Sequence, residues 1–92
     1  MTDIVLEKDL VIQNEKGLHA RAAATFVKAI EDVDAEVLVS RMGQTVGGDS
    51  IMGLMMLAAS KGTVIHIKAK GHEAQRAMDT LTLLINSKFG EQ

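Results

Sequence analysis

Near the start of the chain, Leu6, Leu10 and Ile12 share the even-numbered positions with Lys8, and Glu7, Asp9 and Val11 lie between them. A period of two residues is typical of a β-strand with one buried face, so the even-numbered positions of this stretch are expected to face the core. The polar segment 14–17, which ends in glycine, then interrupts the pattern and predicts a turn. A strand followed by a turn is therefore the first part of the predicted fold.

From Ala20 onward the spacing of the apolar residues changes to three and four, which predicts an amphipathic helix. Charged residues are expected on its outer face. Its buried face is expected to comprise Ala23, Phe26, Val27 and Ile30.

Five further elements follow along the chain. We predict strands over residues 35–41, 45–48 and 63–70, a short helix that ends near Leu57, and a final helix after Gly71 with Ala74, Ala77, Leu81 and Leu84 on its buried face. A hairpin turn is expected at residues 42–44, and Asp49 or Ser50 is the expected cap of the short helix. The order β-α-β-β-α-β-α predicts an α+β fold, in which helices cover one face of an antiparallel sheet.

Composition narrows the class of protein. The chain has 92 residues, 47% of them hydrophobic, which is enough for one small domain over residues 1–92. It has no cysteine, which excludes disulfides and thiolate metal sites. A formal net charge of −2 and only two aromatic residues argue against nucleic-acid binding. Because there is neither a secretory-type leader nor an apolar run long enough to span a bilayer, we expect a cytoplasmic protein without membrane contact.

His19 falls at the N-cap or first position of the first predicted helix. A lone histidine at a helix start is most often a solvated loop residue, but this setting also suits an anion. The backbone amides of Ala20, Arg21 and Ala22 lack partners inside the helix and lie at the positive end of its dipole. Arg21 adds a guanidinium that matches phosphate, and Gly17 lets the turn approach closely.

This arrangement favours covalent phosphate chemistry at His19. A phosphoryl group on the ring would be held by backbone dipoles and one arginine, and the positive surroundings favour the neutral imidazole that a nucleophile requires. The sequence contains no carboxylate dyad, serine–base pair or nucleotide-binding loop. The predicted site therefore carries a phosphoryl group but has no machinery for making one.

Three stretches together resemble one known family: GLHARAAATFV (17–27), GDSIMGLMMLAASKG (48–62) and TVIHIKAKG (63–71). The resemblance is to the HPr family, the histidine-containing phosphocarriers of the bacterial phosphotransferase system, and covers almost the whole chain. It implies an open-faced β-sandwich, with a four-stranded antiparallel sheet under three helices. It also implies that His19 accepts phosphate from phosphorylated enzyme I and donates it to a histidine of an enzyme IIA-type acceptor. In this resemblance Arg21 is the active-site arginine, and no cofactor is implied.

Two positions depart from the family pattern. The proline that usually follows the arginine is Ala22 here, which adds a backbone N–H to the helix start. Lys16 stands where many members have asparagine, and is expected to be solvated. Together with the methionine-rich second stretch, these departures resemble the nitrogen-related branch more than the sugar-transport carriers.

The second helix has almost no polar face. Leu54 and Leu57 are expected in the core, which leaves Ile51, Met52 and Met55 either exposed as a docking surface for enzyme I and its acceptor, or buried in a larger core. Ser50, at the start of this helix, serves as a cap. It also matches the serine that a dedicated kinase phosphorylates in some family members, so Ser50 is a candidate regulatory site for a serine kinase/phosphorylase.

The remaining histidines, His66 and His72, are expected to be solvated, and their spacing to His19 predicts no metal site. The alternative to a phosphocarrier is a regulatory or small-ligand-binding α+β module without phosphoryl transfer, since the same element order occurs in such domains. A monomer is expected in either case.

Overall fold

The computed structural model describes residues 4–91 and contains the helices and strands in the predicted order. The final short 3-10 helix, η1, was not expected from the sequence. The elements are β1 (Val5–Val11), α1 (Ala20–Ile30), β2 (Glu36–Arg41), β3 (Gln44–Gly47), α2 (Ile51–Met56), β4 (Val64–Lys70), α3 (Ala74–Asn86) and η1 (Lys88–Gly90).

The four strands form one antiparallel sheet in the order β1-β4-β2-β3, which confirms the predicted sheet. β4 lies between β1 and β2, so strands far apart in the sequence are neighbours. Leu10 pairs with Ile65, and Val39 pairs with Ile67. These residues are buried, because alternate positions of each strand point to the same face of the sheet.

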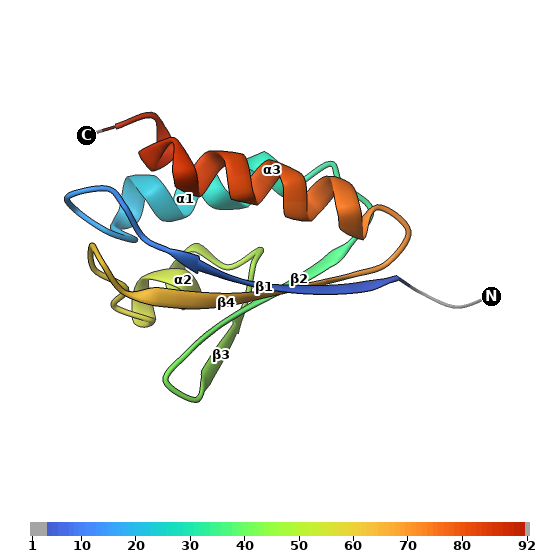
Figure 1. Ribbon diagram of the computed structural model, residues 1–92, viewed down its shortest axis with the longest axis horizontal. Coiled ribbons are helices and arrows are strands. Elements are labelled where there is room, and N and C mark those ends of the chain that lie inside the picture. The colour runs from blue at the N-terminus through green and yellow to red at the C-terminus, as the bar shows by residue number, and fades with distance from the viewer. Residues whose placement is uncertain (1–3, 92) are drawn as a thin grey trace.

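The helices bury the other side of that core. Figure 1 shows α1 and α3 lying beside each other over one face of the sheet, while α2 packs against α1 and β3. Phe26, Leu54 and Leu81 contribute one fully buried side chain from each helix. The predicted inner face of α3 needs correction: Met78 and Ile85 are also buried, whereas Leu84 is only partly buried. No helix within residues 4–91 is long and apolar enough to cross a membrane.

The loop between β1 and α1 is tied to the segment that follows α2. The Leu18 amide donates to the Ala59 carbonyl (2.9 Å), and the Gly62 amide donates to the Ile12 carbonyl (2.8 Å). Gly17 has φ +63°, and a Cβ at this position would overlap the Ala59 carbonyl oxygen. Figure 1 shows this loop, α2 and η1 at one end of the molecule, opposite the start of β1.

Candidate functional site

His19 is the N-cap of α1. Its backbone is extended, with φ −75° and ψ 178°, and its carbonyl accepts the first intrahelical hydrogen bond from the Ala23 amide (2.9 Å). Its ring nitrogen Nδ1 lies 3.3 Å from the Arg21 amide, which donates to it. The ring thus replaces the short oxygen-bearing side chain that usually caps a helix, and one ring nitrogen points at the helix start.

The other ring nitrogen contacts a residue that sequence reasoning missed. Nε2 of His19 lies 2.9 Å and 3.0 Å from the two carboxylate oxygens of Glu91. The side-chain amide of Asn14 donates to the same carboxylate at 2.8 Å. Nothing in the local sequence signals this pair, because 72 positions separate Glu91 from His19.

The hydrogen bonds to Glu91 favour its ionised form. The Asn14 amide contributes most, followed by the His19 ring, and together they hold the pKa of the Glu91 carboxyl below its usual value; Arg21 acts in the same direction. At neutral pH the group is therefore an anion. It places one negative charge beside the positive end of α1.

Two hollows flank His19. The larger, of about 270 Å³, is lined by Glu15, Lys16, His19, Arg21 and Glu91. The smaller, of about 200 Å³, is lined by Lys16, Leu18, His19 and the Ala58–Ser60 segment. Lys61 binds the Glu15 carboxylate at 2.7 Å.

The predicted phosphate-holding residues occupy different environments. Arg21 is exposed and lines the larger hollow together with His19. Ala20 is also exposed, whereas Ala22 is buried, so its methyl group packs in the core. The structure therefore brings His19 and Arg21 together and adds Glu91 and Asn14 to the predicted set.

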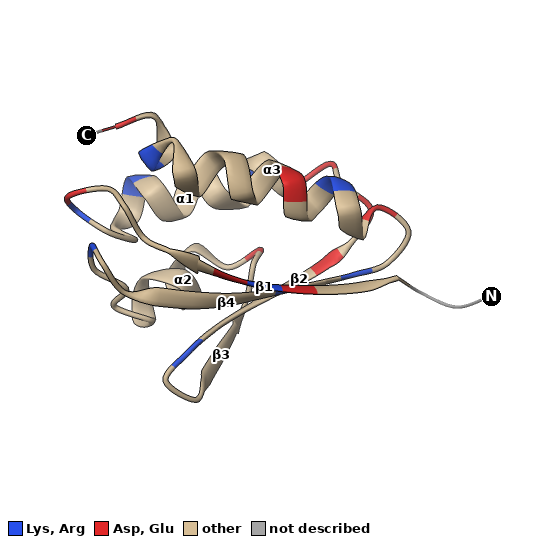
Figure 2. Cartoon of the chain, in the orientation of Figure 1, with Lys and Arg blue, Asp and Glu red and all other residues tan. Residues whose placement is uncertain are grey.

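The structure also shows how α2 begins and which of its side chains are exposed. Ser50 is its N-cap, and the hydroxyl oxygen accepts a hydrogen bond from the Gly53 amide (2.9 Å). Ile51, Met52 and Met55 are 40%, 72% and 40% exposed, so the alternative of a larger core that contains them is wrong. Figure 2 shows α2 without a charged residue along its length.

His66, which was expected in solvent, lies between two acidic residues of β1. Its Nδ1 is 2.7 Å from the Asp9 carboxylate, and its Nε2 is 2.8 Å from the Glu7 carboxylate. These hydrogen bonds, the one to Asp9 first, raise the pKa of His66. His72 is exposed. Among residues 4–91, no group of three or more histidine, aspartate or glutamate residues is placed to hold a metal ion.

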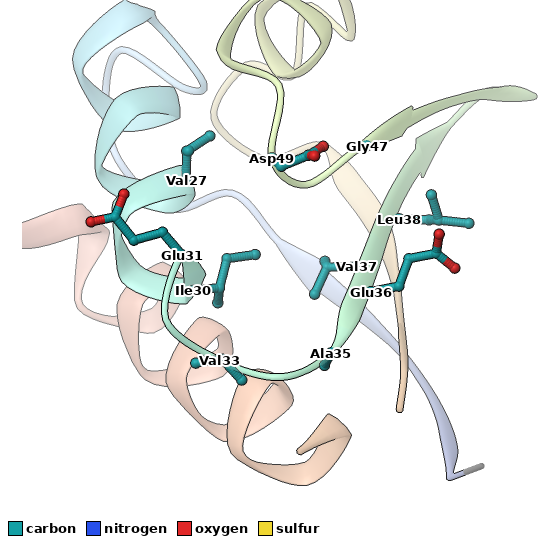
Figure 3. A pocket seen from close by; sticks show the side chains of 10 residues that line it. All are labelled: Val27, Ile30, Glu31, Val33, Ala35, Glu36, Val37, Leu38, Gly47 and Asp49. Carbon is teal, nitrogen blue, oxygen red and sulfur yellow. The ribbon is translucent and has the colours of Figure 1, made fainter. Parts of the chain in front are cut away.

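A further hollow, of about 320 Å³, lies between the end of α1, the start of β2 and the turn at 47–49. Figure 3 shows Val27, Ile30 and Val37 pointing into it and Asp49 at its edge. Its lining is largely aliphatic and, within the described residues 4–91, includes neither His19 nor Arg21. A small-ligand site would be separate from the histidine.

Comparison with known proteins gives consistent matches along nearly the whole chain. A family model described as the PTS HPr component phosphorylation site matches residues 6–87. The phosphocarrier protein HPr of Neisseria meningitidis serogroup A is 47% identical over 87 residues, covering 95% of this chain and 98% of that protein. That of Xylella fastidiosa is 40% identical with the same coverage. A crystal structure of HPr from Thermoanaerobacter tengcongensis gives a TM-score of 0.90 at 39% identity, covering 95% of this chain and 98% of that chain.

The fold and these matches define the class of protein as a phosphocarrier of the phosphotransferase system. The chain belongs to the HPr family. The four-stranded antiparallel sheet with three helices is the fold of the HPr structures, as expected. The two relatives described above are named phosphocarrier protein HPr without a branch, so the nitrogen-related branch stays a prediction.

Proposed function

We propose that His19 carries the phosphoryl group, taking it from phosphorylated enzyme I and passing it to a histidine of an enzyme IIA-type acceptor in the cytoplasm. The observation that supports this most directly is the position of Nδ1, 3.3 Å from the Arg21 amide at the start of α1. A phosphoryl group bonded to Nδ1 would lie where the first helix amides and the helix dipole favour an anion.

The transfer needs no cofactor. The lone pair of Nδ1 attacks phosphorus, a P–N bond forms, and the bond between phosphorus and the donor atom breaks, with its electron pair remaining on the donor. The reverse exchange passes the group to the acceptor. The protein is thus a carrier that turns over only with its two partners, and we propose no independent enzymatic activity.

Arg21 and the amides of Ala20, Arg21 and Ala22 are the groups proposed to hold the phosphoryl oxygens. Arg21 is exposed and lines the same hollow as His19, so its guanidinium can reach a phosphoryl group without disturbing the core.

Ile51, Met52 and Met55 are proposed as the docking surface for both partners. They are exposed, they lie on a helix without charges, and methionine adapts to different partner surfaces. A kinase that phosphorylated Ser50 would place a dianion directly beside this surface. The helix start tolerates that charge, but an apolar interface does not, so the modification would weaken docking of the monomeric carrier.

Phosphorylation by purified enzyme I and phosphoenolpyruvate, followed by mass measurement, tests the site. We expect one phosphoryl group, labile in acid and stable in base, that is absent from His19→Ala and unchanged in His72→Ala. Persistent labelling of folded His19→Ala, on His66 or His72, would overturn the assignment.

Arg21 is tested by the rate of the same transfer. Arg21→Ala should slow it about tenfold or more, since a charge-assisted hydrogen bond contributes roughly 1.5–3 kcal/mol. Arg76→Ala is the matched control, because Arg76 lies on α3, is exposed and pairs with Glu73. Equal rates for the two folded variants would remove Arg21 from the mechanism.

A further inference from the structure

Hydrogen bonds connect the His19 ring to the turn that precedes it. The side-chain amide of Asn14 donates to the Gly17 carbonyl (2.8 Å) and to Oε1 of Glu91 (2.8 Å). Both carboxylate oxygens of Glu91 lie within hydrogen-bonding distance of Nε2 of His19. Glu91 therefore bridges His19 to Asn14, which is fully buried.

The hydrogen-bond partners of the His19 ring determine which ring nitrogen carries the proton. An ionised carboxylate only accepts hydrogen bonds, so Nε2 of His19, which faces it, carries a proton. Nδ1 faces the Arg21 amide, and a backbone amide N–H only donates. Nδ1 therefore presents a lone pair, which is the form of imidazole that attacks phosphorus.

Two features that are unfavourable in free energy accompany the position of Glu91. Asn14 Oδ1 is buried without a hydrogen-bond partner among the described residues 4–91, which is unfavourable for an amide oxygen. Lys88 and Phe89, at φ 60° and 57°, adopt the left-handed backbone that residues with side chains rarely adopt, and Gly90 continues it at 74°. Phe89 is buried in the core and anchors this bend, which directs Glu91 back to the start of α1.

We propose that Glu91, held by Asn14, is a positioning residue for phosphoryl transfer at His19, a role that rests on the function proposed above. It keeps a proton on Nε2 and leaves Nδ1 as the nucleophile. When Nδ1 gives its electron pair to phosphorus, the ring retains the Nε2 proton and gains a positive charge, which the carboxylate stabilises. When the phosphoryl group departs, the electron pair of the P–N bond returns to Nδ1. No proton has to be exchanged with water in either direction.

The ring proton of His19 tests this role in the unphosphorylated protein, without enzyme I. With ¹⁵N-labelled histidine, we expect the Nε2 proton of the wild type to exchange slowly with water and to be detected by NMR. Glu91→Ala should abolish this signal, and Glu91→Gln, whose amide oxygen still accepts a hydrogen bond, should restore it. Glu15→Gln is the matched control, because Glu15 lines the same hollow but pairs with Lys61.

Transfer kinetics give the second readout. Glu91→Ala should lower kcat for transfer from enzyme I about tenfold or more, the factor that corresponds to one charge-assisted hydrogen bond. KM should change little, because Glu91 is not among the α2 residues proposed for docking. Glu91→Gln should recover only part of the loss, since it restores the acceptor but not the charge, and Glu15→Gln should match the wild type.

Asn14→Asp keeps the side-chain shape but removes both amide donors, so it should shift both readouts toward those of Glu91→Ala. If circular dichroism shows this variant unfolded, Asn14→Ser, which is too short to reach Glu91, replaces it. An unchanged Nε2 proton signal and unchanged kcat in Glu91→Ala would overturn the positioning role, even with His19 phosphorylated normally. Labelling of the wild type at a residue other than His19 would instead overturn the proposed function, whatever the NMR result.

Discussion

Replacing Gly17 with alanine should destabilise the protein through two separable effects. The backbone at φ +63° lies in the left-handed region, which costs a residue with a side chain roughly 1–2 kcal/mol. The new Cβ would also overlap the Ala59 carbonyl oxygen, so the hydrogen bond from the Leu18 amide to that oxygen (2.9 Å) must lengthen or break. Leaving this donor without its partner costs roughly 1–3 kcal/mol. The expected total is about 2–5 kcal/mol.

Gly62→Ala separates the two effects. Gly62 also has a positive φ, +88°, but a Cβ there would meet nothing within 4 Å among the described residues. This variant should lose only the left-handed cost, about 1–2 kcal/mol. The difference between the two variants therefore measures the close approach of the loop to Ala59.

Urea unfolding and thermal melts of both variants provide the measurement. Each kcal/mol shifts Tm by roughly 4–8 °C in a domain of this size, so Gly17→Ala should melt at least about 4 °C below Gly62→Ala. At a temperature where both are folded, only Gly17→Ala should slow phosphorylation, because its loop carries His19. Equal melting temperatures for the two variants would refute the steric part of this reasoning.

Three further predictions concern other parts of the surface. Met52→Glu should lower stability by less than about 1 kcal/mol, because Met52 is 72% exposed. It should nevertheless weaken binding to enzyme I at least tenfold, as measured by calorimetry. A large loss of stability, like the roughly 2–5 kcal/mol expected for Leu54→Ala, would contradict the docking surface. Because the pKa of His66 is raised in the folded state, its protonation stabilises the protein below the unfolded pKa, and this contribution is lost as pH rises through the folded pKa. His66→Gln should therefore be less stable than the wild type at pH 6, by less than about 1 kcal/mol, and as stable as the wild type at pH 9. His72→Gln should match the wild type at both pH values, and a loss of stability in His66→Gln that persists at pH 9 would point to another cause. Met42→Asn should stabilise the protein by about 1 kcal/mol or less in a thermal melt. Met42 is 89% exposed and has φ 51°, and Gly43 follows it at φ 82°, so the two residues form a turn that favours Asn-Gly. No gain in Tm would show that the turn is unstrained.

The sequence predicted the parts of the fold that depend on local patterns. The period of α1 placed Phe26 in the core, and the polar residues before α2 placed its cap at Asp49 or Ser50; the structure shows Ser50. The partner of His19 was not predictable in this way. Glu91 reaches the ring only because Lys88 and Phe89 adopt left-handed backbone, which no propensity favours.

His66 shows the same limit of sequence-based prediction within the sheet. The alternation of β4 correctly places His66 on the face opposite the core residues Ile65 and Ile67. It does not show which residues lie across the strand boundary. The register of β1 against β4 pairs Asp9 with His66, and that register is a property of the assembled sheet rather than of either strand.

The central position of β4 has a consequence for how the protein folds. The β2–β3 hairpin is formed by neighbouring segments, but β1 joins the sheet only through β4, with Leu10 opposite Ile65. Pairing β1 with β4 closes the long stretch of chain between them. Such a closure is slow in folding, because the chain loses conformational entropy before the contacts that compensate for it form. The same closure brings Gly62 to Ile12 and Ala59 to Leu18, next to His19. The loop that carries the histidine is therefore ordered in the step that completes the sheet, so folding intermediates that lack this strand pairing would not present an organised phosphorylation site.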